Sequence, residues 1–129
     1  MTAIASQLGL APLDQGGFSM TPSVRANVLV VKVCGNGDMA AIEALGRYLK
    51  LVHREALHLP VAEVELDFLE LYFMNSSCLK ALVSWINSVA NDGNALYRIR
   101  FLTNPKLLWQ RRSLEALRRL APDLVQIES

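Results

Sequence analysis

The sequence has little of what membrane-spanning or exported proteins require. Although 52% of the 129 residues are hydrophobic, charge interrupts every apolar run well before the roughly 18 residues that a membrane span needs. We therefore expect no membrane insertion, and apolar side chains that are buried in a core or at a contact surface. The first 17 residues contain no Lys or Arg and do not resemble a signal peptide. These absences predict a cytoplasmic protein.

Cysteine and histidine are scarce, and neither is spaced as a metal or redox site would be. Cys34 and Cys78 are far apart in the chain, so we predict two buried free thiols and no disulfide. His53 and His58 have no other His or Cys at a ligand spacing, so we predict ordinary surface residues and no metal site. The sequence suggests no cofactor.

The net charge of +1 gives no overall attraction to nucleic acid or anionic lipid. Basic residues gather near the end of the chain, where two pairs of arginines lie two helical turns apart: Arg111 with Arg118, and Arg112 with Arg119. A solvated face and a contact with an acidic protein both remain open, and no interleaved aromatics favour nucleic acid. An acidic run places Glu65 and Asp67 on one strand face, which predicts a solvated or helix-covered face rather than an acid–base pair.

Apolar periodicity predicts strands that alternate with helices. We expect strands at 18–23, 28–34, 61–74, 97–102 and 124–127, and helices from Asp38 to near Pro60, from Asn75 to near Gly93, and from Asn104–Pro105 to Pro122. This order indicates a single α/β domain over residues 18–129, with a mixed, mostly parallel sheet of four to five strands and three to four helices. Residues 1–17 show no periodicity and are predicted to be a flexible lead-in.

The turn after Met74 holds the densest group of polar residues at the carboxyl end of a predicted strand, where α/β sheets commonly carry function. The glycines at 35 and 37 lack the lysine and third glycine of a phosphate-binding loop. Ser76 lies between Asn75 and Ser77 rather than between the glycines of a nucleophile elbow. Trp85 falls beside the main apolar stripe of its helix, where it is either core or a half-exposed interface anchor.

Two stretches together resemble the STAS family, which includes bacterial anti-sigma factor antagonists. Residues 29–38 read Leu-Val-Val-Lys-Val-Cys-Gly-Asn-Gly-Asp, so Gly35 and Asp38 match the family's Gly-x-x-Asp turn. Residues 73–79 read Phe-Met-Asn-Ser-Ser-Cys-Leu and lie without a gap on the family's Phe-Ile-Asp-Ser-Ser-Gly-Leu pattern. The order of elements agrees from about Phe18 to the end. Asn75 replaces the family's Asp, and Cys78 replaces its Gly.

The resemblance implies a non-enzymatic domain of bacterial signal transduction that regulates transcription. In such proteins the unmodified antagonist captures an ATP-binding anti-sigma factor, which is also a serine kinase, and this kinase phosphorylates the first serine of the motif. That serine corresponds to Ser76, and Ser77 is the adjacent candidate. The expected partner-binding residues are Asn75, Ser76, Ser77, Cys78, Lys80, Trp85 and Asp38.

Several alternatives stay open. Other STAS proteins are constitutive scaffold subunits, including one that docks on a lipid-transport ATPase. Ser76 or Ser77 can also serve only as a helix cap, and a hydrolase with Ser76 as nucleophile is a third reading. A homodimer is compatible with the high apolar content.

Overall fold

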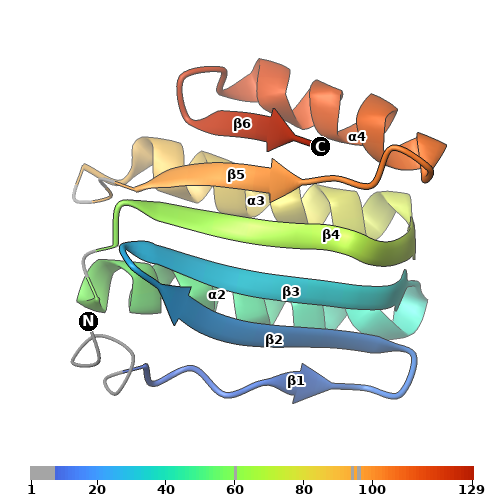
Figure 1. Cartoon of the computed structure of the whole chain (residues 1–129), viewed down its shortest axis with the longest axis horizontal. Coiled ribbons are helices and arrows are strands. Elements are labelled where there is room, and N and C mark those ends of the chain that lie inside the picture. The colour runs from blue at the N-terminus through green and yellow to red at the C-terminus, as the bar shows by residue number, and fades with distance from the viewer. Residues whose placement is uncertain (1–7, 60, 94, 96) are drawn as a thin grey trace.

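Six strands form one sheet in chain order, and three α-helices pack against it (Figure 1). The structure is a computed structural model that describes residues 8–129 except 60, 94 and 96. The elements are β1 (Leu13–Asp14), β2 (Phe18–Arg25), β3 (Val28–Gly37), the 3-10 turn η1 (Met39–Ala41), α2 (Ile42–His58), β4 (Glu63–Met74), α3 (Ser76–Asn91), β5 (Arg98–Leu102), α4 (Leu108–Leu120) and β6 (Val125–Glu128).

The first three strands pair antiparallel, and β3, β4, β5 and β6 pair parallel. In the parallel part, Val31 lies opposite Leu66, which in turn lies opposite Phe101. The predicted mixed, mostly parallel α/β architecture is therefore confirmed. The strand count is one higher than expected, because a two-residue strand, β1, adds to the edge of β2.

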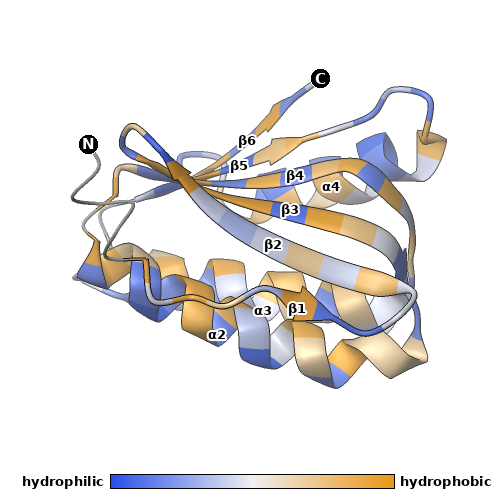
Figure 2. Ribbon diagram, turned by 60° about the horizontal axis from the view of Figure 1, so that its bottom comes forward, coloured by the Kyte–Doolittle hydropathy of each residue, from blue (hydrophilic) through white to orange (hydrophobic). Residues whose placement is uncertain are grey.

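The hydrophobic core lies between the sheet and the helices, and the opposite face of the sheet is open (Figure 2). Alternation along β4 sends Val64, Leu66 and Phe68 into this core. The apolar stripe of α2 meets them, with Leu45 and Leu49 almost fully buried. A one-sided sheet of this kind needs apolar residues only at every second strand position.

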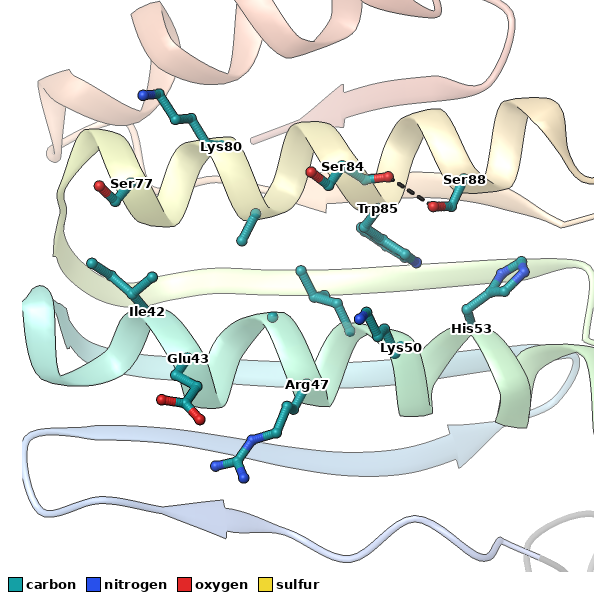
Figure 3. Close-up of a pocket in the computed structure, with 13 residues that line it drawn as sticks. Ile42, Glu43, Arg47, Lys50, His53, Ser77, Lys80, Ser84, Trp85 and Ser88 are labelled. Carbon is teal, nitrogen blue, oxygen red and sulfur yellow. Dashed lines mark hydrogen bonds between the residues drawn. The ribbon is translucent and has the colours of Figure 1, made fainter.

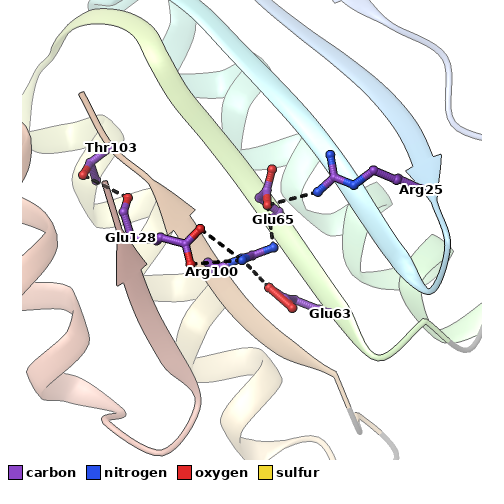
Figure 4. Close-up of polar contacts among 6 residues, drawn as sticks. All are labelled: Arg25, Glu63, Glu65, Arg100, Thr103 and Glu128. Carbon is purple, nitrogen blue, oxygen red and sulfur yellow. Dashed lines mark hydrogen bonds and ion pairs between the residues drawn. The ribbon is translucent and has the colours of Figure 1, made fainter.

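Charged side chains of β2, β4, β5 and β6 form ion pairs on the open face (Figure 4). Arg100 pairs with Glu63 at 2.6 Å, with Glu65 at 2.7 Å and with Glu128 at 3.3 Å. Arg25 also approaches Glu65, at 3.6 Å. No helix covers this face, yet Glu65 is only 5% exposed, because guanidinium groups surround its carboxylate. The predicted grouping of Glu65 and Asp67 on one face holds, but Glu65 is an ion-pairing residue rather than a solvated one.

Two irregularities near the end of β3 shape the carboxyl end of the sheet. The register with β4 shifts between Lys32 and Cys34 and again between Gly35 and Asn36. Gly35 has a φ of 96°, and a Cβ there would lie 2.0 Å from the Gly17 carbonyl oxygen. Glycine is therefore required at position 35. The sequence predicted a turn at residues 35–37, but β3 continues to Gly37.

The expected lead-in at 1–17 lies partly outside the described residues, which begin at Leu8. Leu10 is buried, and β1 pairs with β2. The Glu55 side chain accepts a hydrogen bond from the Gly9 N–H at 2.5 Å. Contacts with the domain therefore begin well before Phe18, the boundary that the sequence suggested.

The third helix begins later than predicted. Asn104 and Pro105 precede it in a turn, and α4 starts at Leu108, with no side-chain cap on its first turn. The Asn104 side chain is engaged elsewhere, because it accepts from the Lys106 N–H at 2.9 Å and donates to the Leu69 carbonyl at 3.0 Å. The Asn-Pro pair thus forms a turn that connects β5 to α4.

Candidate functional site

Asn75 caps the start of α3. Its side-chain oxygen accepts a hydrogen bond from the Cys78 backbone N–H at 2.8 Å, and its backbone is extended, as an N-cap requires. Its own N–H donates to the Gly37 carbonyl at 2.8 Å. Asn75 therefore provides an acceptor for a free N–H group in the first turn of α3 and connects this helix to the end of β3. Neither Ser76 nor Ser77 has the capping role that the sequence left open for them.

The loop after β3 forms the other half of this corner. The Asp38 carboxylate accepts a hydrogen bond from the Ala40 N–H at 3.0 Å and so caps η1. The Cys78 thiol approaches the Asp38 carbonyl at 3.7 Å. A Cβ on Gly37 would lie 3.4 Å from the Met74 Cα, so the two strand ends fit closely. The structure thus brings Asp38, Asn75 and Cys78 together.

Ser76 and Ser77 are exposed at the first two positions of α3. Their hydroxyl groups form no hydrogen bond within the described part of the chain. The first turn of α3 also contains no acidic residue. Because the first N–H groups of a helix lack intrahelical acceptors and carry partial positive charge, this position suits an added anion.

Two of the predicted partner-binding residues are not accessible. Cys78 is fully buried, and Trp85 is 4% exposed. Burial is the main cause that raises the pKa of the Cys78 thiol, and the nearby Asp38 carboxylate raises it further. Both side chains pack into the core, so neither has the exposed surface that the expected contact role would use. Lys80 and Asp38 are exposed, as a contact role requires.

Sequence reasoning missed three exposed apolar residues near this corner. Met39 in η1 is 81% exposed, and Tyr72 and Phe73 at the end of β4 are 54% and 48% exposed. The sequence placed both aromatics in the strand predicted at 61–74 without indicating that they are exposed. The register shifts change the alternation there, and the run Leu71-Tyr72-Phe73-Met74 has no period of two that could have revealed which side chains point outward.

A groove of about 540 Å³ runs between α2 and α3 (Figure 3). Its apolar lining includes Leu49, Ala81 and Trp85. We call it the α2–α3 groove, and it is lined by Ile42, Glu43, Gly46, Arg47, Leu49, Lys50, His53, Ser77, Lys80, Ala81, Ser84, Trp85 and Ser88. Ser77 and Lys80 lie at one end, so the groove is continuous with the corner at the start of α3.

His53 lies at the other end of the groove from Ser77 (Figure 3). Its Nδ1 is 2.7 Å from the Tyr97 hydroxyl, and its Nε2 is 2.9 Å from the Asp92 carboxylate. The prediction of an ordinary surface residue is therefore wrong for His53, which links α2 to the segment after α3. These contacts commit the imidazole to Tyr97 and Asp92, and the structure does not bring it to the serines.

Cys34 is a free thiol and half-buried rather than fully buried. Within residues 8–129, apart from the three gaps, no group of three or more His, Cys, Asp or Glu residues is placed to hold a metal ion. Over the same residues, no helix combines the length and apolar character that crossing a membrane requires.

No family model and no curated protein matches the sequence. Solved structures do match in fold. An anti-sigma factor antagonist from Mycobacterium paratuberculosis superposes with a TM-score of 0.65 at 18% identity, over 90% of each chain. The anti-sigma factor antagonist SpoIIAA in its unphosphorylated form gives 0.55 at 17% identity, over 85% of this chain and 88% of the other.

The phosphorylated form of SpoIIAA from Bacillus gives a TM-score of 0.51 at 17% identity, over 87% of this chain and 91% of the other. The likeness thus covers most of each chain and includes both phosphorylation states of one protein. The fold is that of the anti-sigma factor antagonists, the STAS fold, and the fold that the sequence resemblance implied is confirmed.

Proposed function

We propose that this STAS-fold protein is a non-enzymatic regulatory domain that binds a protein partner through the corner formed by Asp38, Asn75, Ser76, Ser77 and Lys80. The carrying observation is that Asn75 supplies the helix cap, which leaves the Ser76 and Ser77 hydroxyls free and exposed. A serine that stabilises its own helix cannot be modified without a change in stability. Here Asn75 caps the helix, and the serines proposed for modification do not.

Exposed apolar surface beside the serines supports docking at this corner. Met39 and Phe73 are the kind of large, accessible side chains that interfaces bury. A phosphate on Ser76 would bring a charge of about −2 to this surface. The free N–H groups at the start of α3 favour that charge, so the domain stays folded, while desolvation of the phosphate opposes docking.

The partner that fits is an ATP-binding anti-sigma factor with serine kinase activity, in the cytoplasm of a bacterium. This assignment follows the STAS fold and the match of Ser76 to the first serine of the family motif. The unmodified protein binds the partner, and phosphorylation of Ser76, or of the neighbouring Ser77, releases it. The substitution of Cys78 for glycine does not obstruct docking, because its side chain points into the core.

The test uses the purified protein and the anti-sigma factor of the same organism. We expect Ser76→Ala to bind like the wild type and Ser76→Asp to lose most of the affinity. Asn87→Asp is the matched control, since it adds the same charge to an exposed position farther along α3. Equal binding by all three variants would refute the switch, and intact mass after incubation with the anti-sigma factor and ATP measures phosphorylation directly.

A constitutive scaffold role on an ATPase complex is the second candidate. The residue at position 75 favours it, because the family motif has an Asp there and Asn75 lacks that carboxylate. This role predicts co-purification with one ATPase that no substitution at Ser76 disturbs. A hydrolase role predicts instead that a serine-reactive probe labels Ser76. We expect no labelling, because His53 is committed to Tyr97 and Asp92.

A further inference from the structure

The charges around the α2–α3 groove are unbalanced. Its rim carries Arg47, Lys50 and Lys80, whereas Glu43 is the one carboxylate in the lining. None of the three cations forms an ion pair with any residue that the structure describes. Figure 3 shows Arg47 and Lys80 on opposite sides of the groove. An occupant therefore meets an apolar floor and unpaired positive charge on both sides.

Gly46 lies in the wall of the groove and has no structural reason to be glycine. It sits in the interior of α2, where glycine costs roughly 0.5–1 kcal/mol relative to alanine. A Cβ at this position would meet no atom within 4 Å, so packing does not demand its absence. The missing side chain leaves space in the groove, because Gly46 is one of the residues that line it.

The length and lining of the groove suit an α-helix. Its lining spans Ile42 to His53 on one helix and Ser77 to Ser88 on the other, which is about 16 Å or three helical turns on each side. Two helices separated by an apolar furrow accept a third helix by ridge-and-groove packing. Anchors at i, i+3, i+4 and i+7 are the usual form of such recognition.

We propose that the α2–α3 groove binds an acidic amphipathic helix of the protein partner, with its apolar stripe on the half-buried Ile42 and Ala81 and its carboxylates facing Arg47, Lys50 and Lys80. The inference rests on the proposed function, because the groove begins at Ser77 and Lys80 in the docking corner. It adds the chemistry of the partner's contact segment, which the corner alone does not specify.

The probe is a displayed library of 15-residue helices with a fixed leucine stripe and with flanking positions randomised among Asp, Glu, Ser, Gln, Lys and Arg. We expect selection on the wild-type protein to enrich Asp and Glu at the flanks. The best peptide should bind Lys50→Glu/Lys80→Glu at least roughly tenfold more weakly, because like charges then face each other. The matched control, Arg111→Glu/Arg112→Glu, reverses two exposed charges on α4 and should change the affinity less than about threefold.

A Cβ at position 46 would meet no atom within 4 Å, so Gly46→Ala leaves the groove open, whereas Gly46→Trp places an indole ring in the wall of the groove. We expect peptide binding to be kept in the first variant and lost in the second, with both proteins folded by circular dichroism. Enrichment of basic flanks, or full affinity for Gly46→Trp, would overturn the inference. So would binding of phosphatidylglycerol vesicles with no selected peptide, which would indicate a membrane surface instead.

The two proposals fail separately. If Ser76→Asp abolishes binding of the anti-sigma factor but Gly46→Trp does not weaken it, the groove inference is wrong and the proposed switch stands. If the selected acidic helix binds the groove while Ser76→Asp has no effect on the anti-sigma factor, the switch is wrong and the groove site stands.

Discussion

Gln110 donates a hydrogen bond from its side-chain Nε2 to the Phe68 carbonyl at 2.7 Å, across 42 residues of sequence. The same nitrogen reaches the Leu71 carbonyl at 2.9 Å, and the side-chain oxygen accepts from the Asn104 N–H at 2.8 Å. The ladder between β4 and β5 ends at Asp67 and Leu102. A fully buried amide therefore takes the place of a neighbouring strand along the last part of β4.

Replacement of Gln110 by leucine should destabilise the protein strongly. It would leave two carbonyls and one N–H without their partner in a buried site, at about 1–3 kcal/mol for each group that stays unsatisfied. We expect a loss of about 2–5 kcal/mol in the free energy of unfolding, measured by urea denaturation. Gln126→Leu, at an exposed position in β6, is the matched control and should change stability by less than about 1 kcal/mol.

The cap on α3 gives a second prediction. Asn75→Ala removes the acceptor for the Cys78 N–H and should cost about 1 kcal/mol, whereas Asn75→Asp keeps a capping oxygen and should cost little. Asn87→Ala lies at an exposed interior position of the same helix and should be neutral or slightly stabilising. Thermal unfolding of the three variants measures the difference. Equal melting temperatures for Asn75→Ala and the wild type would contradict the capping role.

His53 should contribute to stability, whereas His58 should not. His53→Ala removes the bridge between Tyr97 and Asp92, and we expect a loss of about 1–3 kcal/mol because the buried Tyr97 hydroxyl loses this partner. His58 is exposed at the end of α2, so His58→Ala should stay within about 0.5 kcal/mol of the wild type. Urea unfolding measures both, and similar losses would show that the bridge has no special role.

The buried tyrosines Tyr48 and Tyr97 predict that the protein loses stability at alkaline pH. Burial raises the pKa of Tyr48 from 10.0 to about 12 and also raises the pKa of Tyr97. The folded state thus holds these protons more tightly than the unfolded chain. The resulting stabilisation is complete below about pH 10 and is lost as the pH rises through the folded pKa, about 12 for Tyr48.

Tyr48→Phe should lower stability at pH 7, because it removes the hydrogen bond from the Tyr48 hydroxyl to the Ala11 carbonyl. The variant should also lose less stability than the wild type as the pH rises from 10 to 12. Tyr72→Phe changes an exposed phenol and should leave the profile as it is. Urea midpoints measured from pH 7 to pH 11.5 provide the comparison. A Tyr48→Phe profile parallel to that of the wild type would exclude Tyr48 as a source of the alkaline loss.

Most of the architecture was predictable from local signals. The β-branched run at 28–34, the apolar spacing of α2 and the polar triplet after Met74 each fix an element almost without context. The capping residues also mark helix starts, although they did not show that Asn75 rather than a serine accepts the bond. The Asn104–Pro105 pair predicted the start of α4 too early. Asn104 instead donates a hydrogen bond to the Leu69 carbonyl in β4, a partner that no local pattern reveals.

The candidate site was less accessible to sequence reasoning. Trp85 lies beside the main stripe of α3 yet is buried, because α2 packs against that side of the helix. The exposure of Tyr72 and Phe73 depends on two register shifts in the neighbouring strand. Likewise, the groove depends on how two helices lie side by side, and His53 gains its role from residues 39 and 44 positions away. All of these are properties of tertiary packing.

The ion pairs around Arg100 join strands that are far apart in the sequence. Three carboxylates and two guanidinium groups pair with one another across β2, β4, β5 and β6, on the side of the sheet away from the helices, and one negative charge remains in excess. On this side, charge pairing takes the part that apolar packing has on the helix side, because it connects strands from the beginning and the end of the domain.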